Sequence, residues 1–298
     1  MEIKSTIVLF CTATLLLSVT SCGGDTEKEK KDEVKTHVLD ANSSINTEFE
    51  GKLFSIPSPI ETAILIKSAN SNYNGKMLNS ASRVGDYAST YQRALNLGVY
   101  GADLGYATLY GQNKESLNYL NALEKLGDGL GISSAFDANF AKRFEANSSN
   151  KDSLLVIVQD AYRVGDNFLK KNKQKDVSSL ILTGGWIESM YFATELNKLG
   201  RNEAIINRIG DQKQSLETII LLMEEFNTNG VNNDLIKDLK VLKGYFDNIK
   251  ITYSYVEPMT NAAKHLTVLN HHSSVAASDE IIGEITTKIN EIRTKIIG

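Results

Sequence analysis

The chain has 298 residues, of which 42% are hydrophobic and 23% charged, and its formal net charge is −4. This composition is ordinary for a soluble globular protein and supplies enough apolar side chains for one large or two small domains. The acidic balance disfavours a protein that binds nucleic acid through a broad basic patch, because neutralising phosphates requires clustered Lys and Arg. All three prolines lie outside residues 60–257, which disfavours a loop-rich β-sandwich.

Residues 1–21 are predicted to be a signal peptide. The apolar stretch of residues 7–19 is shorter than the roughly 20 residues that a membrane-spanning helix needs. Charged residues resume at Asp25, so the stretch cannot be extended into a span. The alternative is a buried N-terminal helix.

The end of this segment carries a more specific motif. Val19-Thr20-Ser21-Cys22 resembles the lipobox of bacterial lipoproteins. The resemblance implies that the chain is cut before Cys22 and that this cysteine carries fatty-acyl chains such as palmitate, which anchor the protein to a membrane. Gly23, in place of Asp, implies the outer membrane, with the protein facing the periplasm or the cell surface. Cys11 would leave with the signal, so the mature protein would have no disulfide.

Residues 22–52 are rich in charge and poor in aromatic side chains. Such a segment buries too little apolar surface to offset the entropy of ordering the chain. We therefore expect the lipidated cysteine to be followed by a flexible tether, and residues 53–298 to form a single all-α domain.

From residue 59 onward, apolar residues recur at helical spacing. A helix is predicted at 59–69 and another at 278–297, and Gly127 and Gly200 stand where helix C-caps belong. The second helix carries a buried stripe from Ile282 to Ile296. Two further stripes step by three and four and each predict one buried helix face: Leu154 to Phe168 and Leu235 to Ile249. Strands are expected to be minor at most.

The chain also contains an ordered series of short matches that predicts a duplication. We place the two tandem pseudo-repeats, of about 80 residues each, at about 83–162 and 163–245. They would form a helical bundle or a short α-solenoid. The matches are Arg83-Val84-Gly85-Asp86 with Arg163-Val164-Gly165-Asp166, Gly98-x-Tyr100 with Gly184-x-Trp186, Tyr106 with Phe192, Leu126 with Ile209, and Asp152 with Asp234.

One set of polar residues stands out on the helices that carry Gly98 and Gly184. It consists of Tyr100, Asp103, Tyr106, Trp186 and Glu188. A carboxylate among small and aromatic residues is costly unless it is hydrogen-bonded or paired, so both carboxyl groups are expected to be buried. The set is either the floor of a ligand cleft between the repeats or a packing interface satisfied by hydroxyl groups.

Other patterns predict less chemistry. The spacing of Gly98, Gly101 and Gly105 does not fit a dinucleotide-binding loop and instead favours close helix packing. His265, His271 and His272 do not have a recognised metal-binding spacing, so we interpret them as exposed residues of a loop at 257–277. We find no catalytic motif, and we expect no metal or cofactor.

Three stretches of the mature chain resemble a family of bacterial envelope lipoproteins for which we know no activity. They are Pro57-Ser58-Pro59-Ile60-Glu61, the run from Ala94 to Leu104, and Gly184-Gly185-Trp186-Ile187-Glu188. The resemblance implies a secreted helical fold over most of residues 50–298 and transfers no catalytic residue.

Three functions remain open from the sequence. The first is a non-catalytic binding or interaction module anchored to the membrane through Cys22. The second is a hydrolase or lyase that uses Asp103 and Glu188 as an acid/base pair. The third is a carrier of a hydrophobic ligand, which requires an apolar pocket.

Overall fold

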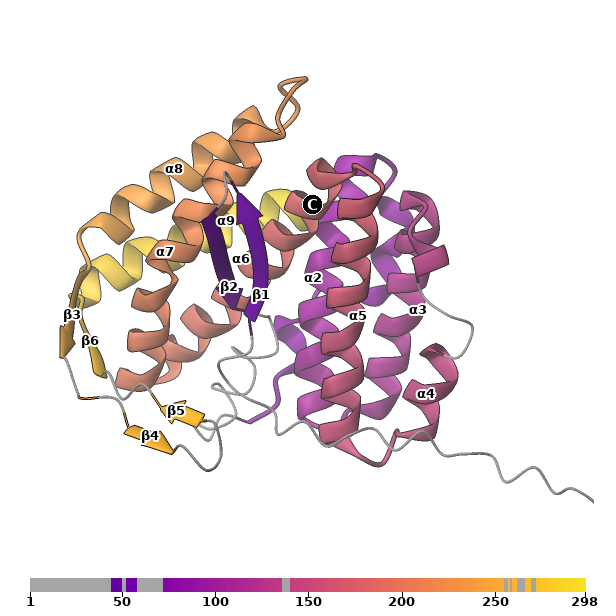
Figure 1. Cartoon of the computed structure of the whole chain (residues 1–298), viewed down its shortest axis with the longest axis horizontal. Coiled ribbons are helices and arrows are strands. Elements are labelled where there is room, and N and C mark those ends of the chain that lie inside the picture. The colour runs from indigo at the N-terminus through magenta and orange to yellow at the C-terminus, as the bar shows by residue number, and fades with distance from the viewer. Residues whose placement is uncertain are drawn as a thin grey trace, which may run out of the picture. The chain divides into compact units, whose positions relative to one another are not determined.

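The computed structural model describes residues 44–49, 52–57, 72–135, 140–254, 257, 259–261, 266–268 and 272–298 (Figure 1). The predicted signal peptide at 1–21, Cys22 and the helix expected at 59–69 lie outside these ranges. None of the helices in the described ranges is long and apolar enough to cross a membrane.

The predicted all-α class is confirmed, and the described residues are mainly helical. The principal helices are α2 (Thr90–Leu109), α3 (Asn113–Leu130), α4 (Phe140–Ala146), α5 (Lys151–Lys171), α6 (Lys175–Leu199), α7 (Glu203–Glu225), α8 (Asn233–Asp247) and α9 (Asp279–Ile297). Shorter 3₁₀ turns occupy η1 (Gly75–Met77), η2 (Ala81–Asp86) and η3 (Ser133–Ala135).

Three antiparallel strand pairs correct two sequence predictions. Strand β1 (Ser44–Phe49) pairs with β2 (Lys52–Pro57). The prediction of a flexible tether up to residue 52 is therefore wrong for the residues of β1. The loop predicted at 257–277 instead contains β4 (Met259–Asn261), β5 (Leu266–Val268) and β6 (His272–Ala276). β4 pairs with β5, and β6 pairs with β3 (Lys250–Ser254). These strands were missed because alternation over three to six residues is too short to stand out from the surrounding polar sequence.

Helices α2 and α6 form the centre of the bundle, and both are buried over most of their surface. α2 packs against α3, α5 and α6, whereas α6 also packs against α7 and α9 (Figure 1). The two central helices approach closely at a pair of glycines. A Cβ on Gly98 would lie 2.0 Å from the Ile181 carbonyl oxygen, and one on Gly184 would lie 2.0 Å from the Leu95 carbonyl oxygen. The interpretation of Gly98 as a packing glycine therefore holds.

Helix ends follow local capping chemistry. The Ser89 side chain accepts a hydrogen bond from the Gln92 amide at the start of α2, and the Ser278 side chain accepts one from the Ile281 amide at the start of α9. Helix α6 is capped by Gly200, as predicted, but α3 continues past Gly127. It ends at a different glycine, Gly131, whose φ of 71° is the left-handed conformation that glycine adopts readily.

The duplication stays a prediction. Gly98 lies on α2 and Gly184 on α6, and the matched residues Asp152 and Asp234 lie in the first turns of α5 and α8. By contrast, the matched Arg-Val-Gly-Asp sequences fall in η2 and in the middle of α5, so this pair adopts two different local structures.

Candidate functional site

Two carboxyl groups and one guanidinium meet in the interior of the bundle. Asp103 lies on α2 and Glu188 on α6, and both have 0% exposed surface. Arg293 reaches them from α9 with 9% of its surface exposed. The predicted burial of both carboxyl groups is therefore confirmed.

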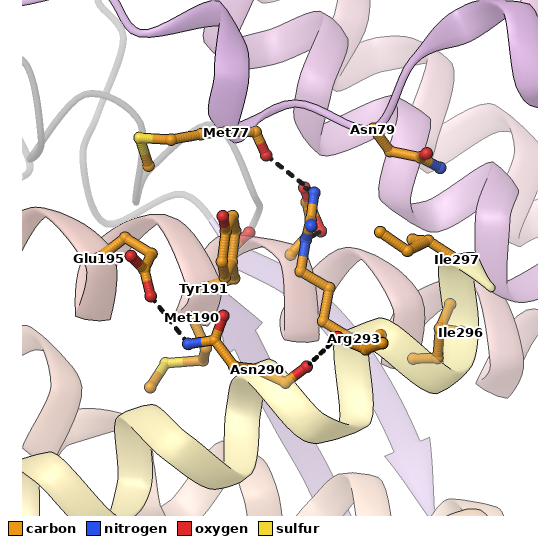
Figure 2. A network of polar contacts seen from close by, with 12 residues as sticks. Met77, Asn79, Met190, Tyr191, Glu195, Asn290, Arg293, Ile296 and Ile297 are labelled. Atoms are coloured by element: carbon orange, nitrogen blue, oxygen red, sulfur yellow. Dashed lines mark hydrogen bonds and ion pairs between the residues drawn. The ribbon is translucent and has the colours of Figure 1, made fainter.

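Arg293 is fully engaged by its neighbours. Its Nε and one terminal nitrogen donate to the two Glu188 carboxylate oxygens at 2.6 and 2.7 Å. The same terminal nitrogen donates to the Met77 carbonyl at 2.8 Å, and the guanidinium lies 3.9 Å from the centre of the Tyr191 ring. Figure 2 shows the side chain rising from α9 beside Tyr191 towards Met77. Burial alone would lower the pKa of Arg293, but the Glu188 carboxylate outweighs this and raises it.

Asp103 is held differently from Glu188. Burial, reinforced by the charge of Glu188, raises the pKa of Asp103 well above its usual value. The nearby Asn79 backbone amide opposes this rise in pKa, yet within the described ranges neither Asp103 oxygen has a hydrogen-bond partner. An ionised carboxylate without acceptor bonds would be very costly there. The raised pKa favours the neutral acid form of Asp103, which lies buried beside the ionised Glu188.

This protonation makes the cluster electrically balanced. Burial also raises the pKa of Glu188, but the charge and hydrogen bonds of Arg293 oppose that rise. One cation, one anion and one neutral acid then share a site closed to solvent. The arrangement ties α2, α6 and α9 together.

The aromatic members of the predicted set form hydrogen bonds with residues other than Asp103. The Tyr100 hydroxyl donates to the Ser80 carbonyl at 2.9 Å and not to Asp103. The Tyr106 hydroxyl accepts from the Asn74 amide at 3.2 Å. Trp186 donates from its indole nitrogen to Gln212 at 3.0 Å.

A separate cavity of about 320 Å³ lies among α2 to α6. Its lining comes from α2 (Leu97, Gly101, Leu104), α3 (Leu120, Leu123, Glu124, Gly127, Asp128), the following turn (Ile132, Ser133), α4 (Phe140, Ala141), α5 (Val158, Ala161, Tyr162, Gly165, Asp166, Leu169) and α6 (Ser178, Ile181, Leu182, Gly185, Trp186). Of the five residues proposed for a cleft, only Trp186 lines this cavity; Tyr100, Asp103, Tyr106 and Glu188 do not.

Most of the cavity wall is apolar, and its interior polar groups are already bonded. The Tyr162 hydroxyl lies against Gly101 and donates to the Gly98 carbonyl at 3.3 Å. Asp166 accepts from Ser178 at 2.6 Å and forms an ion pair with Lys170 at 2.5 Å. Such a wall can hold an apolar group but offers no arranged nucleophile or acid/base pair.

Glu124, Asp128 and Ser133 are the solvent-exposed members of the lining, so they mark where the cavity opens. The Ser133 hydroxyl donates to Asp128. Glu124 and Asp128 stand one turn apart on α3, and neither forms an ion pair within the described ranges.

Arg293 and the cavity were both missed by the sequence analysis. Arg293 lies four residues after Ile289 and three before Ile296, which places it at the edge of the buried stripe of α9. That position is the signal that could have identified it. The cavity had a weaker signal in Gly165 and Gly185, two glycines in its lining that present no side chain to it.

No group of three or more His, Cys, Asp or Glu residues is placed to hold a metal ion in the part of the chain that the structure describes. His272 lies on β6 opposite Ser254, while His265 and His271 fall outside that part.

Comparison with known proteins finds no matching family model, no matching curated protein and no matching solved structure. A functional assignment therefore depends on the site itself.

Proposed function

We propose that this chain is a lipid-anchored protein of the bacterial envelope that binds a small apolar ligand without transforming it. The observation that carries the proposal is the largely apolar, partly open cavity of about 320 Å³ lined by α2 to α6. Its volume is at the lower end of the range for small-molecule sites, about 300–1,000 Å³.

The cavity suits an apolar group of limited size. If each non-hydrogen atom occupies roughly 30 Å³, as a water molecule does in the liquid, the space holds about ten such atoms. An apolar occupant would displace water from this wall and make van der Waals contacts with it.

The acid/base alternative has less support. Asp103 and Glu188 are inaccessible to solvent, and neither lines the cavity. Glu188 is bonded by Arg293, and the Asp103 oxygens, although without hydrogen-bond partners, are buried away from the cavity. We therefore propose a structural role for these carboxyl groups and a non-catalytic role for the protein.

The envelope assignment depends on the lipobox-like Val19-Thr20-Ser21-Cys22. Acyl chains on Cys22 would hold the protein at the outer membrane, on the periplasmic or the outer side, close to a source of apolar molecules.

The test is direct binding of 1-octanol, whose nine non-hydrogen atoms match the cavity. The mature chain carrying Cys22→Ser needs no detergent and is titrated by calorimetry. Ala161 lines the cavity, and Ala161→Phe would add six ring carbons inside it. Val156 is equally half-buried on α5 but does not line the cavity, so Val156→Phe is the matched control.

We expect octanol to bind the parent and the Val156→Phe chain with similar affinity and to bind the Ala161→Phe chain at least tenfold more weakly. Circular dichroism verifies that each variant is folded, and Ala141→Phe on α4 provides a second filling variant. Failure of octanol to bind the parent, or parent-like octanol affinity in both filling variants, would show that the proposed function is wrong.

A further inference from the structure

We infer that the ligand is an amphiphilic amine, with an apolar tail inside the cavity and a cationic head group at its opening. This inference rests on the proposed function and adds the charge of the ligand to it. It is carried by the uneven distribution of charge around the cavity.

The opening is negatively charged. Glu124 and Asp128 are exposed lining residues on α3, spaced so that both side chains lie on the same face of the helix. The third lining carboxylate, Asp166, is already compensated by Lys170 and hydrogen-bonded by Ser178. The two α3 carboxylates therefore leave about two negative charges at the opening.

No positive charge offsets them in the described lining, which contains no Lys, Arg or His. Arg93 reaches the same end of α3, but it donates to the backbone carbonyls of Tyr87 and Gly129 and forms no ion pair with either carboxylate. A fatty acid entering tail first would bring its carboxylate up to this opening and be repelled. A primary ammonium group would instead be attracted by both side chains.

The apolar wall and the acidic opening together select one arrangement of ligand. The interior polar groups are already bonded, so the head group gains nothing by entering. At the opening the ammonium stays hydrated while it interacts with Glu124 and Asp128. A chain of about eight carbons fills the space behind it, since the cavity holds about ten non-hydrogen atoms.

The experiment compares octylamine, octanol and octanoate with the mature Cys22→Ser chain at low and high salt. The variant Glu124→Gln/Asp128→Asn removes both charges and keeps the side-chain shapes. The control Glu280→Gln/Glu284→Gln removes two exposed carboxylates at the same spacing on α9, away from the cavity lining.

We expect octylamine to bind roughly tenfold or more tightly than octanoate at low salt. The ratio of octylamine affinity to octanoate affinity should fall at high salt, because exposed charges are screened. The ratio should approach one in the α3 variant and stay unchanged in the α9 control, while octanol affinity is the same in all three chains.

Two results would overturn the inference and leave the proposed function intact, provided that octanol binds. One is equal affinity for octylamine and octanoate in the parent chain. The other is an amine preference that persists in the α3 variant. Absence of octanol binding is the separate result that overturns the proposed function, and the inference fails with it.

Discussion

Substituting Arg293 with Met removes the cation that faces Glu188 in the interior. The side chain makes two charge-assisted hydrogen bonds to Glu188 and a third to the Met77 carbonyl, and it stacks on Tyr191. Methionine keeps much of the apolar volume but replaces none of these contacts. The variant is therefore left with a buried carboxylate whose compensating charge is gone.

Removing one partner of a buried ion pair typically costs about 3–5 kcal/mol. For a domain of this size that loss corresponds to a fall in melting temperature of about 6–20 °C. The loss of stability should grow as the pH rises. Without Arg293, the Glu188 carboxyl group is protonated in the folded chain and ionised in the unfolded chain, so a higher pH favours unfolding.

Urea denaturation at several pH values, followed by circular dichroism, measures this loss. The double variant Glu188→Met/Arg293→Met is the decisive companion, since replacing a whole buried pair by apolar side chains is often neutral. We expect it to be more stable than Arg293→Met alone. A loss below about 1 kcal/mol for Arg293→Met, or a double variant as unstable as the sum of the single variants, would refute the assignment of a paired buried charge.

Four other substitutions test separate parts of the protein. The raised pKa of Asp103 means that wild-type stability falls as the pH rises above the ordinary carboxyl value of about 4. Asp103→Asn should therefore gain stability relative to wild type between pH 4 and pH 8 in urea titrations; an opposite trend would mean that Asp103 is ionised. Gly184→Ala would place a Cβ 2.0 Å from the Leu95 carbonyl oxygen and should cost about 3 kcal/mol or more in thermal unfolding. Gly244→Ala on α8 has open space and should add up to about 1 kcal/mol; similar effects of the two changes would contradict the close α2–α6 contact. Cys22→Ser should move the protein from the detergent phase to the aqueous phase in a detergent-partitioning assay, and unchanged partitioning would contradict the predicted lipidation.

The helical framework could be predicted because its signals are local. The C-terminal helix was expected at 278–297 and lies at Asp279–Ile297 with Ser278 as its N-cap, because isoleucine spacing and a capping serine occur within the same segment. Burial of Asp103 and Glu188 was also predictable, since charged residues surrounded by small and aromatic side chains have no solvated face.

The partners of these residues could not be predicted in the same way. Glu188 and Arg293 are separated by 105 positions, and only the packing of α9 on α6 brings them together. The cavity is likewise a product of how several helices fail to fill the space between them, which no single segment encodes. The error at Gly127 has a different origin, because two glycines four residues apart offer the same capping signal and only Gly131 adopts a positive φ.

The central claim is that the space among α2 to α6 holds an apolar ligand. The most direct measurement is a crystal structure of the mature chain with 8-bromooctylamine, in which anomalous scattering locates the bromine. The account predicts a single strong bromine peak inside the cavity, enclosed by residues such as Leu104 and Ile181, with the amine near Glu124 and Asp128. A cavity without bromine, in crystals where the compound occupies only sites elsewhere on the surface, would contradict it.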